Sequence, residues 1–322
     1  MSRRTRRIPL PRELEPLARL IEDLGRTYET SRVFFDFVEM SALSIANSCD
    51  LAQKPAREER YLHLIKQYRT LEERRMFPAM MAELVGALER TEQDVLGPIS
   101  AALGLCSQAN GQVWTPWSVS YMMAKMSLHP PEQIAEQIKR HGFMTFAEPA
   151  CGPGGMILAF AQAFQEAGFN PQQQLHVTAV DRAPWCVHMS FVQCALSGIP
   201  AVIVLGDSLA GTEREHWRTP MHFWRQFPQR LAMRSMYEAM RDVMQTGQQA
   251  DMPADAPPEP APPPAAPPPE PQMTRVEVAT AMAMASVAGT LAAQGEDDLD
   301  FGMLPSTAAI LLANPPYAAP VA

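Results

Sequence analysis

One short stretch of the sequence constrains the fold more than any other. It is FAEPACGPGGM at residues 146–156, where an acid and a proline lead into three glycines, Gly152, Gly154 and Gly155, at the head of an apolar run. Glycine has no Cβ, so a strand that turns into a helix through these residues brings bare backbone and unpaired helix N–H groups close to a ligand. The stretch therefore predicts a strand, a tight turn and a helix, with a binding site at the turn.

Beyond this turn the sequence continues to alternate between strand-like and helix-like runs. Short β-like runs are separated by apolar runs of helical length, in the order 143–149, 155–168, 175–182, 184–198 and 201–208. Strands that alternate with helices of this length indicate βαβ units and a parallel sheet. We expect an α/β fold with a Rossmann-like sheet.

The composition divides the rest of the chain. Residues 1–111 hold a basic arm followed by apolar positions three and four apart, which predict a helical N-terminal domain, and residues 112–241 hold the α/β domain with a basic helical extension. Residues 242–273 are rich in proline and predict an extended linker, and residues 274–322 form an Ala/Met-rich tail that ends in the NPPY motif.

The net charge of -8 is distributed unevenly. From Asp242 onward there are ten acids and one base, Arg275, so this part carries -9 and residues 1–241 carry about +1. The arginines of the first part are able to meet phosphates, or they lie on solvated helix faces and in a disordered arm. They are Arg3, Arg4, Arg6, Arg7, Arg214, Arg218, Arg225, Arg230, Arg234 and Arg241.

Cysteine spacing and hydropathy exclude several protein classes. The five cysteines form no CxxC pair and no His/Cys zinc pattern, so we expect neither a disulfide framework nor a metal, and a cytoplasmic location. The N-terminus lacks the apolar core of a signal peptide, and no apolar run is long enough to cross a membrane. We therefore expect no membrane partner.

The glycine turn by itself fits a dinucleotide, a phosphate or another nucleoside cofactor. Gly152, Gly154 and Gly155 do not fit GxGxxG, and no GK[ST] follows them. Dinucleotides and triphosphates are therefore less favoured than another nucleoside.

At this point the residues resemble a known family. EPACGPGGM is similar to the D-P-A-C-G-[ST]-G-G-[FM] signature of N6-adenine DNA methyltransferases, especially the methylase subunit of type I restriction-modification systems. Four further pieces follow the family's order: TPWSV at 115–119, AVDR at 179–182, GDSL at 206–209 and NPPY at 314–317. The resemblance implies an enzyme that uses S-adenosylmethionine to methylate adenine in DNA.

The resemblance also implies a role for each matching residue. The glycine loop would surround the methionine part of the cofactor, with Glu148 where the family has Asp, while Asp181 would bind the ribose hydroxyls and Asp207 the adenine amino group. The implied cofactor-binding residues are Thr115, Pro116, Glu148, Pro149, Ala150, Cys151, Gly152, Gly154, Gly155, Met156, Asp181, Arg182, Asp207 and Ser208.

The NPPY motif would carry the reaction, with Asn314, Pro315, Pro316 and Tyr317 as the catalytic residues. The Asn314 side-chain oxygen and the Pro315 carbonyl would accept the two hydrogens of the adenine amine, which localises its lone pair toward the sulfonium methyl group. Tyr317 would stack on a target base that has flipped out of the duplex. Neither a metal nor a covalent enzyme intermediate is required.

Other interpretations of these motifs stay open. The glycines are also compatible with a plain strand-to-helix turn, and Asp181 and Asp207 with ordinary caps at strand ends. NPPY follows Asp207 by about a hundred residues, further than the family has it. The alternatives are a catalytically degenerate module that binds cofactor or DNA, and a methyltransferase for a small molecule or a protein. An active DNA enzyme would also need a target-recognition region, which a separate specificity subunit could supply.

Overall fold

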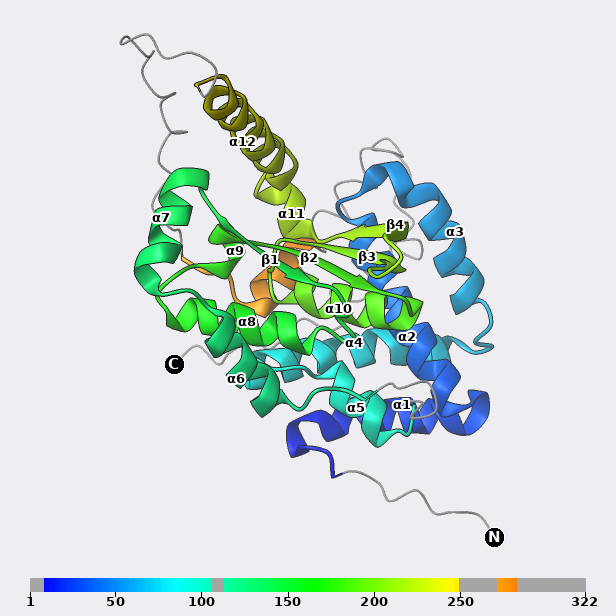
Figure 1. The fold of residues 1–322 in the computed structure, drawn as a ribbon. Helices are drawn as coiled ribbons and strands as arrows, with labels where there is room; N and C mark the ends of the chain where they lie inside the picture. Colours follow the sequence, from blue (N-terminus) through cyan, green and yellow to red (C-terminus); the bar gives the residue numbers. More distant parts are fainter. Residues whose placement is uncertain (1–8, 106–112, 249–270, 283–322) are drawn as a thin grey trace, which may run out of the picture.

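A computed structural model describes residues 9–105, 113–248 and 271–282 of the chain (Figure 1). Its helical elements are η1 (Arg12–Leu14), α1 (Glu15–Tyr28), α2 (Thr30–Asn47), η2 (Leu51–Gln53), α3 (Lys54–Ile65), α4 (Leu71–Thr91), α5 (Leu96–Ala102), α6 (Trp117–Ser127), α7 (Pro131–His141), α8 (Gly155–Glu166), α9 (Pro171–Gln174), α10 (Pro184–Leu196), α11 (Pro220–Trp224) and α12 (Phe227–Gln248). The strands are β1 (Met144–Glu148), β2 (Leu175–Asp181), β3 (Ala201–Asp207) and β4 (Thr212–Arg218). A further helix spans 275–282.

The sheet has four strands in the order β1-β2-β3-β4. β1 pairs with β2 and β2 with β3 in parallel, whereas β4 joins β3 in antiparallel orientation. The prediction of an α/β fold is confirmed, and the predicted runs around the glycine turn correspond to β1, α8, β2, α10 and β3. The sheet is mixed rather than all parallel because of β4.

The structure departs from the expected helical extension after β3. TEREHWR at 212–218 is a strand, because a sharp turn through Gly211 reverses the chain against β3 and turns the indole of Trp217 inward. Trp217 is 5% exposed and contacts the rings of His188 and Phe191 on α10. Helix α12 then runs to Gln248, past the residue where we expected the linker to begin.

The helical N-terminal region and the sheet share one hydrophobic core. Helices α8 and α10 cover one face of the sheet, and α1, α4 and α5 of the N-terminal region form a further layer beyond them (Figure 1). Buried side chains continue without a break from Leu17 on α1, through Phe37 on α2, to Val192 on α10 and Ile203 on β3. The N-terminal region is therefore a structural support for the sheet.

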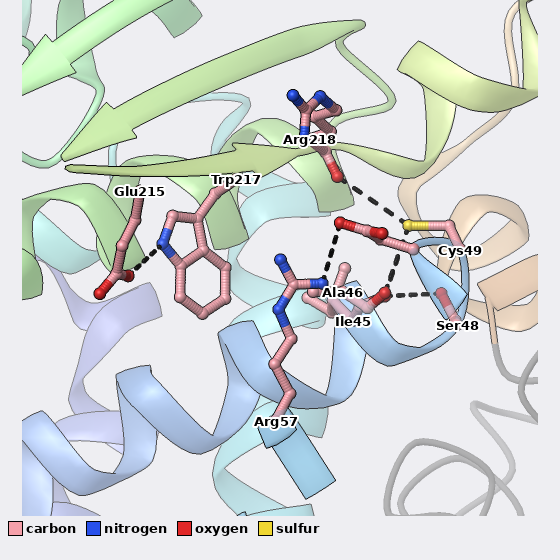
Figure 2. Close-up of polar contacts among 9 residues, drawn as sticks. Ile45, Ala46, Ser48, Cys49, Arg57, Glu215, Trp217 and Arg218 are labelled. Carbon is pink, nitrogen blue, oxygen red and sulfur yellow. Dashed lines mark hydrogen bonds and ion pairs between the residues drawn. The ribbon is translucent and has the colours of Figure 1, made fainter. Parts of the chain in front are cut away.

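The same region also contacts the end of β4. Arg57 on α3 forms an ion pair with Asp50 at 3.1 Å, both side chains being 12% exposed, and its guanidinium lies 5.0 Å from the centre of the Trp217 ring. Figure 2 shows this junction, with Cys49 Sγ directed at the Arg218 carbonyl 3.9 Å away. We call Cys49, Asp50, Arg57, Trp217 and Arg218 the β4 junction.

Beyond the proline-rich stretch, residues 271–282 pack against the body of the protein. The Gln172 side chain exchanges two hydrogen bonds of 2.8 Å with the backbone of Met273. The next residues begin a helix that buries Val278 and Met282. The start of the expected tail therefore belongs to the core. None of the helices within the described ranges is long and apolar enough to cross a membrane.

Candidate functional site

The site forms at the carboxyl edge of the three parallel strands. Each of these strands ends in an acid: β1 in Glu148, β2 in Asp181 and β3 in Asp207. Parallel strands that pair side by side present their carboxyl ends at one edge, so the three carboxylates line the same rim. The glycine loop that follows β1 joins them there.

The loop owes its path to two of its glycines. Gly152 has φ +52° and Gly154 has φ +99°, a region that residues with a Cβ rarely adopt. The Cys151 N–H donates to the Val180 carbonyl at 2.9 Å, so the loop folds back onto the end of β2. Gly155 then begins α8.

Asp181 holds the loop in place. Its Oδ2 accepts the Gly152 N–H at 2.9 Å, and its Oδ1 accepts the Ala183 N–H at the same distance. A carboxylate has about four lone-pair positions, so about two remain for a ligand. Asp181 thus has a structural role, as a cap does, and also keeps capacity to bind hydroxyl groups.

The end of β3 is tied to the same loop. Ser208 Oγ donates to the Pro149 carbonyl at 2.8 Å, and Asp207 Oδ1 accepts the N–H groups of Leu209 and Ala210. Arg182 Nε lies 3.3 Å from Asp207 Oδ2, but its side chain is 80% exposed. Such an exposed pair is weak and easily displaced.

Two further groups of the loop have shifted acidities. Burial raises the pKa of Glu148, whose Oε1 accepts the Ala150 N–H at 3.1 Å. Burial, and next the negative charge of Asp181, raise the pKa of the Cys151 thiol well above its ordinary value. Cys151 therefore stays protonated and fills space, because a nucleophilic cysteine requires the thiolate.

The approach from the N-terminal side is partly covered by Trp114. Thr115 and Pro116 are exposed at the start of α6, which runs alongside α8 and is tied to it by Lys125 Nζ at 2.8 Å from Glu166. A Cβ added to Gly152 would lie 3.3 Å from Cζ3 of the Trp114 ring. Part of the bare backbone that we expected to face a ligand therefore faces this indole.

Gln193 and Asp94 are two site residues that the sequence did not reveal. Gln193 Nε2 donates to Asp94 Oδ1 at 2.9 Å and to the Pro153 carbonyl at 2.7 Å, and its Oε1 accepts the Val95 N–H at 2.8 Å. Asp94 also accepts the Gly97 N–H at 2.9 Å, and burial raises its pKa. We call Gln193 and Asp94 the loop latch, because they connect α10, the α4–α5 connection and the glycine loop.

Each residue of the loop latch has a sequence feature that could have indicated a structural role. Gln193 is fully buried within a helix that is otherwise mostly apolar, and such a polar group needs partners. Asp94 stands three residues before Gly97, the spacing of a side chain that caps a helix start. Neither residue by itself identifies the other, which lies 99 positions away.

The predicted catalytic residues Asn314 to Tyr317 lie outside the described residues. The described part of the chain gives β1 one partner strand, β2, and leaves Thr145 and Ala147 exposed. Among the described residues, the outer edge of β1, beside the glycine loop, therefore has no partner strand.

The charge of this edge limits what it can bind. Three carboxylates at the rim repel phosphate, whereas backbone N–H groups and carboxylate oxygens suit a ligand with hydroxyl, amine or cationic groups. Within the described ranges, no three His, Cys, Asp or Glu side chains lie close enough together to hold a metal ion.

Comparisons with known proteins gave no match, so a function can be inferred only from the geometry of the site. No protein-family model matches the chain, and no curated protein and no solved structure matches it either.

Proposed function

We propose that the chain binds S-adenosylmethionine at the glycine loop and transfers its methyl group to the N6 amino group of adenine in DNA. One observation supports the cofactor-binding half of this proposal. Glu148, Asp181 and Asp207 lie around a glycine loop at the carboxyl ends of neighbouring parallel strands. The cofactor carries a positive sulfonium and an ammonium group, which three carboxylates attract. It also carries ribose hydroxyls and an amine, which carboxylates accept as hydrogen-bond donors.

The roles of the acids follow from their partners. Asp181 has about two lone-pair positions left for the ribose hydroxyls while it continues to hold Gly152. Asp207 would accept the adenine amine once the exposed Arg182 side chain moves away. Glu148 is suited to the ammonium group, and Thr115 and Pro116 would border the methionine end beside the loop.

The transfer half of the proposal depends on Asn314 and Tyr317. An apolar run, AAILLA at 308–313, leads directly into NPPY. A strand formed by this run and added in parallel to the open edge of β1 would end beside the glycine loop, at the methyl donor. DNA is the partner in this proposal, with a separate specificity subunit to select the sequence.

Isothermal titration calorimetry with S-adenosylmethionine tests the binding half. We expect Asp181→Asn, which removes the charge and leaves one acceptor oxygen for the N–H groups of Gly152 and Ala183, to weaken binding at least about tenfold, or 1.4 kcal/mol. Asp23→Asn, at an exposed position on α1 far along the chain, is the matched control and should bind like the unmodified protein. No heat from folded protein at any concentration of cofactor would overturn every cofactor-based assignment.

A transfer assay with a labelled methyl group tests the reaction. The unmodified chain should label duplex DNA at adenine N6, and Asn314→Ala should lose labelling while it keeps the affinity for S-adenosylmethionine. Protein and small-molecule pools run beside the DNA, because methylation of either pool in place of DNA would select that alternative substrate.

A degenerate cofactor- or DNA-binding module is the second candidate. It is favoured by two observations: the Trp114 ring faces Gly152, and Arg182 pairs with Asp207 at 3.3 Å. Both groups occupy surface that the cofactor would use. Binding of S-adenosylmethionine without transfer to any of the three pools would select this candidate over the enzyme.

A further inference from the structure

Helix α12 carries an exposed apolar face. The helix projects beyond the rest of the protein (Figure 1). Three of its large apolar side chains lie in solvent: Met233 is 55% exposed, Met236 68% and Met240 50%. At about 100° per residue the three fall within about 60° of one another, so they lie in one row along the helix. We call Met233, Met236 and Met240 the methionine stripe.

Charged residues of α12 lie on the other side of the helix and contact the body of the protein. The Arg230 guanidinium donates to the carbonyls of Gly142 at 2.7 Å and Gln173 at 3.0 Å, and Arg234 Nη1 lies 3.5 Å from Thr145 Oγ1. A surface helix ordinarily has the reverse arrangement, with apolar residues toward the core and charged residues toward solvent. The inverted arrangement indicates that another element covers the methionine stripe.

The spacing of the stripe favours a helix as the covering element. Its three residues are three and four positions apart, which is the a/d spacing of a seam between two helices, and Val243 continues this spacing in the sequence. Ala232 and Ala239, which are exposed and stand one heptad apart, border the stripe. Small side chains beside a seam let a second helix approach closely.

The charge of the face restricts the partner further. From Gln229 to Met240, no charged residue of α12 lies within about 60° of Met236 around the helix axis. A nucleic acid needs cations that face its phosphates. A helix on a membrane surface presents Trp, Phe or Leu to the lipid and keeps Lys and Arg free for the headgroups. A helix with an equally uncharged stripe buries no unpaired charge, and α12 of a second copy is such a helix.

We propose that two copies of this chain pair through their methionine stripes, with the two α12 helices antiparallel about a twofold axis. A contact of one surface with itself closes at two copies. Because α12 projects from the body, the antiparallel arrangement sets the two bodies at opposite ends of the helix pair (Figure 1).

This contact does not involve the candidate site. Arg230 bonds to Gly142 and Gln173, which precede β1 and β2, whereas the glycine loop follows the other end of β1. The proposal is therefore independent of S-adenosylmethionine binding.

Sedimentation equilibrium of the full chain tests the pairing. The stripe spans about 10 Å along the helix at 1.5 Å per residue, and contacts this small give transient complexes. We expect the average mass to rise reversibly from one chain toward two chains between about 1 and 500 µM. Met236→Lys, at the most exposed position of the stripe, should weaken pairing at least about tenfold, because it sets a cation against the apolar stripe of the other copy.

Two controls separate pairing from folding. Met126→Lys makes the same change at a methionine that is 77% exposed on α6, and it should pair like the unmodified chain. Met236→Glu alone should weaken pairing as Met236→Lys does. An equimolar mixture of the two variants should recover pairing, because opposite charges then face each other between the copies.

Each outcome supports or overturns the proposal. Pairing that is lost in Met236→Lys and recovered in the mixture supports it, whether or not the protein binds S-adenosylmethionine. The mass of one chain at every concentration would overturn it. A mass that grows beyond two chains, or an equal loss in Met126→Lys, would indicate a head-to-tail contact of α12 with α6 and also overturn it. A lower melting temperature of Met236→Lys in the dilute monomer would show that another part of the same chain covers the stripe, with the same consequence.

Discussion

At the β4 edge of the sheet the N-terminal region contacts the end of the strand, whereas the β1 edge has no second strand among the residues that the structure describes. On the β4 side, Trp217 is 5% exposed and lies beneath Arg57 of α3. On the β1 side, Thr145 and Ala147 are exposed on a strand of five residues. One edge thus contributes to the core, and the other borders the candidate site and has a single partner strand among the described residues.

The two edges of the sheet therefore differ in role: the β4 edge contributes to the stability of the fold, and the β1 edge borders the candidate site. An antiparallel strand can end a sheet when other elements cover part of it, and α3 and the α2–α3 connection contact the end of β4 at the β4 junction (Figure 2). Thr145 and Ala147 lie on one face of β1 and are exposed there, whereas parallel sheets commonly have both faces covered. Variants on the two edges should therefore differ sharply in their effect on folding.

The largest expected effect is at the β4 junction. Trp217→Ala removes a buried indole that contacts His188, Phe191 and Arg57, and we expect it to lower the free energy of unfolding by about 3 to 5 kcal/mol. Thr145→Ala, at an exposed position of β1, should change it by less than about 0.5 kcal/mol. Urea unfolding measures both, and similar values for the two variants would contradict the contrast.

The next effect is a pH dependence that comes from His188 on α10, whose ring contacts Trp217 of the β4 junction. Burial, and next the charge of Arg60, lower the pKa of His188 to about 3. The folded protein then keeps His188 neutral while the unfolded chain, with a pKa near 6.5, binds a proton, so stability is complete above about pH 6.5 and falls as the pH drops toward 3. Between pH 6.5 and 4 we expect a loss of roughly 2 to 3 kcal/mol from this residue.

Unfolding curves at several pH values measure this loss. His188→Phe keeps an aromatic ring against Trp217 and should reduce the slope of stability with pH in that window. His176 and His222 keep part of the slope, because burial lowers their pKa values to about 3 and about 4 and they contact each other at 3.0 Å. His129→Gln, at an exposed position, is the control. An unchanged slope in His188→Phe would refute the assignment.

A smaller loss of unfolding free energy is expected at the loop latch, which connects the N-terminal helical region and α10 to the glycine loop. Gln193→Leu leaves the Val95 N–H and the Pro153 carbonyl without their partner, at a cost of about 1 to 3 kcal/mol. Because the loop loses an anchor, the affinity for S-adenosylmethionine should fall as well. Gln173→Leu, a half-buried glutamine at the end of α9, is the comparison variant, and an equal effect on cofactor affinity there would count against a specific role of Gln193.

Local patterns explain which parts of the fold the sequence predicts. The runs that became β1, α8, β2, α10 and β3 each carry their signal within one window of apolar periodicity and glycine punctuation. The acids at the strand ends were predicted for the same reason, since each directly follows its run. Their placement on one edge requires only that parallel strands pair in sequence order.

Long-range contacts explain which parts the sequence does not predict. TEREHWR is polar enough to suit a solvated helix, but the turn through Gly211, the pairing with β3 and the packing of Trp217 against α10 and Arg57 make it a strand. The loop latch joins residues 99 positions apart, and the contact of the Trp114 ring with Gly152 joins two segments that no local pattern connects. Tertiary contacts of this kind override local propensity.

The smallest effect tests the open edge itself. In a strand, successive N–H groups point alternately to its two sides, so about half of the β1 amides face away from β2. If AAILLA at 308–313 pairs there, the full chain should protect these amides from hydrogen exchange, and a chain that ends at residue 282 should exchange them at least about tenfold faster, or 1.4 kcal/mol of local stability. The amides of β4 should exchange equally in both chains, because the β4 junction lies within residues common to both. Equal exchange of the β1 amides in the two chains would contradict the placement of NPPY at the glycine loop. It would not affect the proposal that the loop binds S-adenosylmethionine. It would therefore favour the degenerate module over the enzyme.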